Sequence, residues 1–176
     1  MNADKPSTAE SEAHDLLFNT RRSARYHMRR EAFYDGWNKA TSAVAVIFGS
    51  AAVGALISDL NNHLAIYAAA TVAVFSAIDL VAGTAAKARL HNDLRRRFLD
   101  IEQKIAGSDA TATKVLKADY LKIEADEPPV LRALDTICYN DLLQADGYSP
   151  DDGHYVKLRW YERWTSHFIN WPVSTH

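Results

Sequence analysis

Cysteine is scarce in this sequence: Cys138 is the only one among 176 residues. A single cysteine excludes an internal disulfide framework and is typical of a protein kept in a reducing compartment. The beginning of the chain also lacks an apolar segment, because Met1–Glu12 is polar and acidic. We therefore expect that the chain is not exported.

Motifs of the common enzyme classes are missing as well. The sequence has no HExxH, no CxxC and no nucleophile elbow, the short motifs that place zinc ligands or catalytic nucleophiles. The segment Gly49–Ala55, GSAAVGA, has two glycines but no lysine, and it lies within an apolar run. We expect no enzymatic activity, no metal site and no cofactor.

Charge is absent from the first of two long apolar runs. Residues 40–58 read ATSAVAVIFGSAAVGALIS without a charged residue, and residues 64–86 carry one, Asp79. A helix rises about 1.5 Å per residue, so about 19 residues span roughly 28 Å, close to the hydrocarbon thickness of a bilayer. With Asn61-Asn62 as a polar turn between them, the two runs predict a transmembrane helical hairpin.

Basic residues flank this hairpin on both sides. Residues 21–39 include six basic and two acidic residues, residues 87–104 include six basic and three acidic ones, and the loop 59–63 has no lysine or arginine. Because basic residues concentrate in cytoplasmic flanks, we expect both chain ends to be cytoplasmic. The residues expected at the membrane interface are Trp37, Lys39, Lys87 and Arg89.

A soluble alternative stays open, in which an alanine-rich hairpin is buried in a helical bundle. Alanine is nearly neutral for membrane insertion, and Asp79 would cost about 2.5–3.5 kcal/mol at the membrane centre. The lengths of the two runs, the charge asymmetry and the lack of any other long apolar run favour the membrane.

Small residues recur at steps of four in both runs. In lipid such residues let helix backbones approach closely and favour association, although an alanine-rich sequence also produces this spacing by chance. We expect self-association through these faces, and any pore requires an oligomer because two helices cannot enclose one. The helix-packing candidates are Ser50, Gly54, Ala65, Ala69, Ala73 and Ala77.

Asp79 is the residue that departs most from the apolar pattern. An acidic residue inside a membrane usually faces protein or water and is a functional candidate. On a helix it shares a face with small and polar residues, and folding the hairpin about its turn brings it near Thr41 and Ser42, with Lys39 at the boundary. Two interpretations stay open: a structural carboxylate bonded by these neighbours, or a pore-lining or gating group. The pore or gating candidates are Asp79, Ser76, Gly83, Thr41 and Ser42.

The rest of the chain is charged and predicts further helices. We expect an all-α fold with a disordered N-terminus over 1–13, a core over 14–106 and a cytoplasmic helical tail over 107–176. One apolar stripe at helical spacing follows the second run; it consists of Leu90, Leu94, Phe98, Ile101 and Ile105. Residues 109–152 carry ten acids and four bases, so we expect these helices to pack beside the basic ones.

Aromatic residues gather near the end of the chain. Tyr161, Trp164, Phe168 and Trp171 recur on one face of a predicted terminal helix. We expect this face to dock into the protein's own bundle, with an interfacial membrane anchor as the alternative.

Two histidines, His27 and His91, lie inside the basic helices. We expect them to be half-buried polar rings, with binding of an anionic headgroup or nucleotide as the alternative. The basic clusters themselves are explained by membrane topology and anionic lipid, so direct nucleic-acid binding is not expected.

The order of segments resembles a known family. A basic helix containing ARYHMRREAFYDGWNKAT, two closely spaced apolar runs and a helix beginning AKARLHNDLRRRF are similar to the SLATT family, two-transmembrane effectors of bacterial conflict systems. The resemblance covers about 21–105 and implies an oligomeric effector that perturbs or permeabilises the bacterial inner membrane when a partner sensor, of nucleotidyltransferase or reverse transcriptase type, is triggered. The alternative is a non-enzymatic helical scaffold or adaptor.

Overall fold

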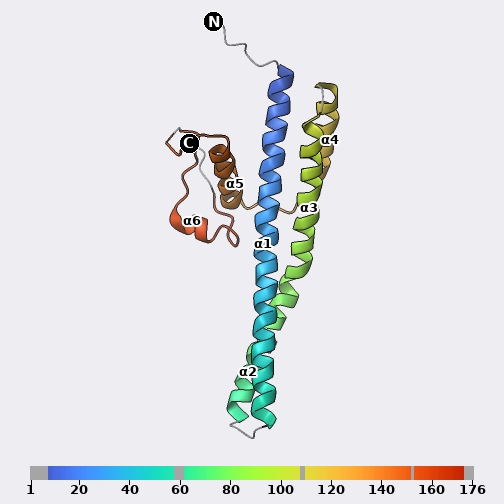
Figure 1. Ribbon diagram of the computed structural model, residues 1–176. Helices are drawn as coiled ribbons and strands as arrows, with labels where there is room; N and C mark the ends of the chain where they lie inside the picture. Colours follow the sequence, from blue (N-terminus) through green and yellow to red (C-terminus); the bar gives the residue numbers. More distant parts are fainter. Residues whose placement is uncertain (1–7, 58–61, 108–109, 152, 173–176) are drawn as a thin grey trace. The chain divides into compact units, whose positions relative to one another are not determined.

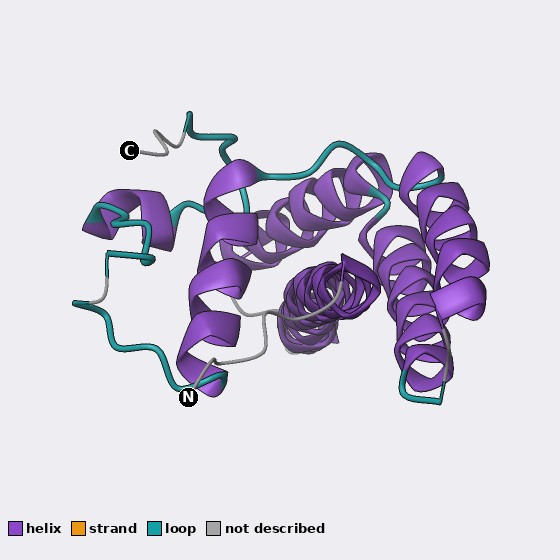
Figure 2. Cartoon of the chain, turned by 90° about the horizontal axis from the view of Figure 1, so that it is seen from above, coloured by secondary structure: helices purple, strands orange, loops and turns teal. Residues whose placement is uncertain are grey.

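The computed structural model describes residues 8–57, 62–107, 110–151 and 153–172. Within these residues it contains helices and loops and no strand, so the all-α prediction is confirmed for them (Figures 1 and 2). The helices are α1 (Thr8–Ile57), α2 (Asn62–Ala82), α3 (Thr84–Ile105), α4 (Ala110–Ala125), α5 (Arg132–Ala145) and α6 (Trp160–Trp164).

The long helix α1 joins the basic segment to the first apolar run without a break, as the sequence predicts. It begins at Thr8, however, so residues 8–13 are helical and not disordered as we expected. Alanine and glutamate dominate this first stretch and are strong helix formers. Glu10 lies in the first turn, where its negative charge stabilises the positive end of the helix dipole. Residues 1–7 of the predicted disordered segment lie outside the described residues.

The chain forms two compact units. We call residues 1–30 with 91–176 the bundle unit, and residues 31–90 the hairpin unit. This division differs from the boundaries expected from sequence, which separate 14–106 from 107–176. The reason is that side chains of α4 share one core with the beginning of α1 and the second half of α3.

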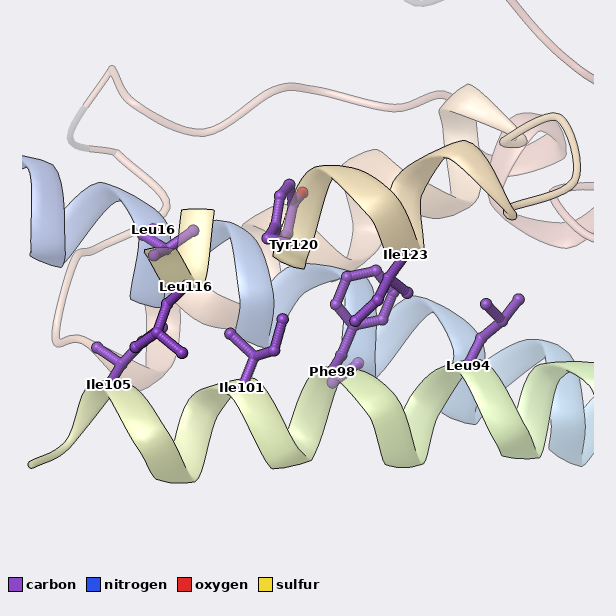
Figure 3. Close-up of a cluster of buried hydrophobic side chains, with 9 residues drawn as sticks. Leu16, Leu94, Phe98, Ile101, Ile105, Leu116, Tyr120 and Ile123 are labelled. Carbon is purple, nitrogen blue, oxygen red and sulfur yellow. The ribbon is translucent and has the colours of Figure 1, made fainter. Parts of the chain in front are cut away.

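The core of the bundle unit contains most of the predicted apolar stripe. Leu94, Phe98, Ile101 and Ile105 of α3 are buried, and Figure 3 shows them facing side chains of α4. Leu90, the first residue of the predicted stripe, is exposed and belongs to the hairpin unit. The nine core residues are Leu16, Ala24, Leu94, Phe98, Ile101, Ile105, Leu116, Tyr120 and Ile123.

Ion pairs connect the basic helices to acidic residues of the bundle unit. Arg21 contacts Glu102 at 2.8 Å, and Arg22 contacts Asp135 at 3.3 Å. Two further pairs link Arg29 to Asp141 at 2.5 Å and Arg97 to Asp126 at 2.8 Å. Acidic residues from the stretch 109–152 therefore pack beside the basic helices, as expected. Because these side chains are partly exposed, each pair contributes about 0–1 kcal/mol.

The end of the bundle unit differs from the predicted helices. Because proline is tolerated in the first turn of a helix, Pro128-Pro129 predicts a helix start, but α5 begins later, at Arg132 with Leu131 as its N-cap. The terminal helix α6 ends at Trp164, and residues 165–168 form turns. Thr165 and Ser166 donate their hydroxyls to the carbonyls of Tyr161 and Arg163, and hydroxyl side chains that bond the local backbone in this way favour turns over helix.

Candidate membrane-facing hairpin

Large apolar side chains cover much of the outer surface of the hairpin unit. They come from the last part of α1 and from α2, and Val81 is the most exposed of them at 88%. Soluble monomers rarely expose so many large apolar side chains on two neighbouring helical segments, and such surfaces are typical of sites that bind lipid or another protein. The exposed residues are Val46, Ile47, Phe48, Val53, Ile66, Tyr67, Val74, Phe75, Ile78, Leu80 and Val81.

The interior of the hairpin unit contains small residues. Ala52 of α1 and Ala65 and Ala68 of α2 are buried, and alanine at such positions lets helix backbones approach closely. Among the six predicted helix-packing residues, only Ala65 is buried. The other five are not: Ser50, Gly54, Ala69, Ala73 and Ala77 are exposed.

The positions of these residues around the helix axis explain why some are buried and others are exposed. Ala65 and Ala68 lie on the same helical face as Asp79, whereas the steps of four from Ala65 drift around the helix, because four residues exceed one turn of 3.6. The face opposite Asp79 holds Ile66, Val74 and Val81, all exposed. Asp79 thus lies on the face that packs inside the hairpin unit.

The chain turns at Gly83, inside the second predicted span. Gly83 has φ of +60° and separates α2 from α3. The backbone hydrogen bonds nevertheless continue, since Gly83 N donates to Asp79 O at 2.9 Å and Lys87 N donates to Gly83 O at 3.0 Å. Glycine suits this position because a residue with a Cβ atom is strained at this φ.

Asp79 is bonded across this turn. The buried hydroxyl of Thr84 donates to Asp79 Oδ1, so the carboxylate is held by a residue five positions later. Of the other predicted pore or gating residues, Ser76 is exposed and Gly83 is half-buried. The structure therefore brings Asp79 together with Gly83 and Thr84, and no sequence pattern indicated Thr84 as a partner.

The partners expected for Asp79 on the first span are bonded elsewhere. Thr41 Oγ1 and Ser42 Oγ both donate to the carbonyl of Asn38, at 3.0 Å and 2.8 Å. Lys39 contacts Asp35 at 2.7 Å. Hydroxyls on helices often bond the carbonyl three or four residues earlier, and a lysine and an aspartate four residues apart lie on one helix face. These local bonds explain why the expected partners are not found at Asp79.

Two of the residues expected at the membrane interface contact aromatic rings within the hairpin unit. Lys87 Nζ lies 5.6 Å from the centre of the Tyr34 ring, close enough for a cation–π contact. Trp37 is half-buried beside Phe33, with ring centres 6.3 Å apart. The remaining two residues, Lys39 and Arg89, are exposed.

Within the described residues, one helical stretch is long and apolar enough to cross a membrane. It lies in Ala65–Ile105, and 6% of its most apolar window is buried inside the protein. A core helix of a soluble protein passes the same test of length and composition but is mostly buried, which this one is not. The first predicted span, 40–58, ends at a residue outside the described ones.

The two histidines of the basic helices meet inside the bundle unit. His27 and His91 are buried, with their Nδ1 atoms 2.8 Å apart, and His27 Nε2 lies 2.9 Å from Glu127 Oε1. His27 also stacks on Phe98, with ring centres 5.6 Å apart. Both rings are more deeply buried than we expected. No sequence pattern indicated Glu127 as a partner, since it is 100 residues from His27.

Metal ligands do not gather anywhere in the part of the chain that the structure describes: no three His, Cys, Asp or Glu side chains lie close enough to hold an ion. Cys138 is buried, and burial raises the pKa of its thiol to about 12, which keeps it protonated. Comparison with known proteins gave no matching family model, no matching curated protein and no matching solved structure.

Proposed function

We propose that this chain is a membrane effector of a bacterial conflict system, which oligomerises in the inner membrane and perturbs it when a partner sensor is triggered. The observation that carries the membrane part is the exposed apolar surface of the hairpin unit. The effector part rests on the resemblance of the segment order to the SLATT family.

The free energy of transferring these exposed apolar side chains from water into lipid supports a membrane location. Moving a large apolar side chain from water into an apolar environment contributes about 1.5–3 kcal/mol when it is fully buried. Val46, Ile47, Val74 and Val81 are each more than half exposed, so their transfer into lipid is favourable and their exposure to water is costly. The basic residues on both flanks then remain on the cytoplasmic side.

Oligomerisation would use the small residues that the single chain leaves exposed. Ala69, Ala73 and Ala77 are spaced by four along α2 and are exposed in the hairpin unit. In lipid, small residues at steps of four form close helix contacts. A second copy packed on these alanines would bring several hairpins together, which a pore requires.

Asp79 would act at the turn of α2 into α3. Its carboxylate bonds Thr84, and its neighbour Gly83 adopts a conformation that depends on glycine. An acidic group inside a membrane is costly unless it faces protein or water. Opening of this turn would expose the carboxylate to an aqueous path, which is the gating role that we propose.

The experiment measures membrane potential in bacterial cells that carry the chain together with its neighbouring sensor gene. On triggering, we expect the potential to collapse, and we expect Asp79→Asn or Ala69→Leu with Ala73→Leu to prevent the collapse. Asp35→Asn is the matched control, because Asp35 is also a paired carboxylate of the hairpin unit but lies outside the predicted spans.

Two results would contradict the proposal. If the membrane potential is maintained after triggering while the cells still stop growing, the chain does not act by permeabilising the membrane. If the chain is recovered without detergent in the soluble fraction, its hairpin is covered by protein, and the scaffold or adaptor role replaces the effector role.

A further inference from the structure

Near the C-terminal end of the bundle unit, several large apolar side chains are exposed and belong to neither of its buried clusters. Trp160 is 75% exposed, Trp164 82%, and Phe168 and Ile169 lie beside them in sequence and are also exposed. We call Trp160, Trp164, Phe168 and Ile169 the aromatic patch. The sequence predicts that Trp164 and Phe168 dock into the bundle, and the structure places them outside it.

The segment that carries the patch is held in place by other residues. Tyr161 packs on Trp171, with ring centres 5.4 Å apart, and Trp171 Nε1 donates to Thr165 Oγ1 at 2.7 Å. Arg30 Nη1 of α1 donates to the carbonyl of His167 at 2.8 Å. The patch is therefore presented outward by an anchored segment.

A second bond ties the segment to α5. Arg132 N donates to the side-chain oxygen of Asn170 at 3.0 Å, so the segment is fixed at both α1 and α5. The aromatic residues thus divide into two sets. Tyr161 and Trp171 hold the segment to itself. Trp160 touches the edge of Tyr161, with ring centres 5.9 Å apart, but Trp160 and Trp164 both keep most of their surface exposed.

Basic residues lie close to the patch in sequence. Lys157, Arg159 and Arg163 are exposed, whereas residues 110–151 of the same unit are strongly acidic. Glu162 is the one acid in residues 157–163, and its side chain accepts a hydrogen bond from Arg159 N at 2.7 Å at the N-terminus of α6. The patch therefore combines tryptophan side chains with a local excess of positive charge.

We propose that the aromatic patch docks onto the surface of an anionic lipid bilayer. Tryptophan concentrates at membrane–water interfaces, where its ring is partly apolar and partly hydrogen-bonded. Arginine adds attraction to anionic headgroups while its aliphatic stem lies along the apolar region. This inference rests on the proposed membrane location of the hairpin, and it adds a second contact with lipid made by the bundle unit.

Hydrogen exchange tests the docking on the full chain in lipid nanodiscs. Amides of 160–169 are compared in nanodiscs of phosphatidylcholine alone and in nanodiscs that also contain phosphatidylglycerol. Each arginine near an anionic surface strengthens binding roughly fivefold, so the two arginines predict roughly twenty-fivefold slower exchange with the anionic lipid. Arg159→Gln with Arg163→Gln removes the difference between the lipids, and Trp160→Ser with Trp164→Ser removes the protection.

Leu121→Ser is the matched control, because Leu121 is an exposed apolar residue of α4 in the same unit; it leaves exchange at 160–169 unchanged. Slow exchange at 133–143 of α5 shows that each variant is folded. If 160–169 exchanges equally fast in both lipids while 65–82 is protected, docking is wrong and the membrane hairpin stands.

Other outcomes point elsewhere. If the amides of 65–82 exchange freely in nanodiscs, the hairpin is not in the bilayer. The proposed function is then wrong, and the docking that rests on it is wrong as well. If 160–169 is equally protected in detergent without lipid, and this protection rises with protein concentration, the patch binds a second copy of the chain and the lipid proposal is overturned.

Discussion

Replacing Phe98 by alanine tests whether the core of the bundle unit is one cooperative structure. Phe98 is fully buried in α3, stacks on His27 and lies 5.5 Å from the ring of Tyr120 in α4. Phe98→Ala removes contacts with two other helices at once. A buried phenylalanine replaced by alanine costs about 3–5 kcal/mol in unfolding free energy.

Cys138 provides the assay for this loss. It is the only cysteine, it is fully buried in α5, and its pKa is raised to about 12 by burial. Cys138 packs with Tyr26 and Leu134 in a second buried cluster of the unit. A thiol reagent reacts when this cluster opens, and if the unit is cooperative the labelling rate follows the population of the globally open state when closing is fast. A loss of about 3–5 kcal/mol predicts labelling faster by roughly two to three and a half orders of magnitude.

Leu121→Ala is the control for this experiment, because Leu121 lies in α4 and is exposed. It should change the labelling rate by less than about threefold, in line with the small effect of surface substitutions. If Phe98→Ala changes the rate no more than the control, then Cys138 opens independently of the α1–α3–α4 core, and the description of one cooperative bundle unit is wrong.

Three further predictions concern the turn, the C-terminal segment and the buried histidines. Gly83→Ala should lower the unfolding free energy by about 1–2 kcal/mol, because φ is +60° there; Gly49→Ala in α1, where nothing lies near an added Cβ, should raise it by about 0.5–1 kcal/mol. If unfolding measured in detergent shows that both substitutions stabilise the protein equally, the helix runs straight through residue 83. Burial, with Arg30 and Arg29 nearby, lowers the pKa of His167 to about 4, so the unfolded state binds a proton between about pH 6.5 and 4 and the folded state does not. The bundle unit should lose up to about 3 kcal/mol as the pH falls through this window, and His167→Gln should flatten the profile; equal profiles would refute this. Glu127→Ala should cost about 1–3 kcal/mol because it leaves His27 Nε2 without its acceptor, whereas Glu127→Gln keeps an oxygen and should cost less; equal losses in thermal unfolding would contradict this explanation.

Periodic apolar residues made much of the fold predictable. The spacing of Leu94, Phe98, Ile101 and Ile105 places one face of a helix in a core, and the structure buries all four. The uncharged run in α1 and the apolar face of α2 likewise follow from residue type alone. Helical geometry also placed Ile66, Val74 and Val81 opposite Asp79, where the structure exposes them.

Contacts between distant residues could not be predicted in the same way. His27 meets Glu127 across 100 residues, and neither residue type nor spacing indicates that pairing. Gly83 lies in a run whose composition favours a continuous helix, so the turn there depends on a local conformation that periodicity does not reveal. The bond from Thr84 to Asp79 depends on this turn, and it was missed for the same reason.

The C-terminal segment shows a different limit. Spacing alone placed Tyr161, Trp164, Phe168 and Trp171 on one helical face, but α6 ends at Trp164. Once the helix ends, residues after it no longer share the face of those before it. Hydroxyl side chains at 165 and 166 bond the local backbone, and the chain leaves the helix there, so Phe168 and Trp171 do not continue the predicted face.

The most direct test of the central claim is the labelling of one cysteine on the hairpin and one on the bundle unit. Val74→Cys and Leu121→Cys are introduced singly into a Cys138→Ala chain; the two positions are 56% and 53% exposed within the protein itself. Open membrane preparations are treated with a charged maleimide before and after addition of detergent. If the hairpin lies in lipid, the cysteine at 121 is labelled at once and the cysteine at 74 only after detergent is added; equal labelling of both without detergent would contradict a membrane location.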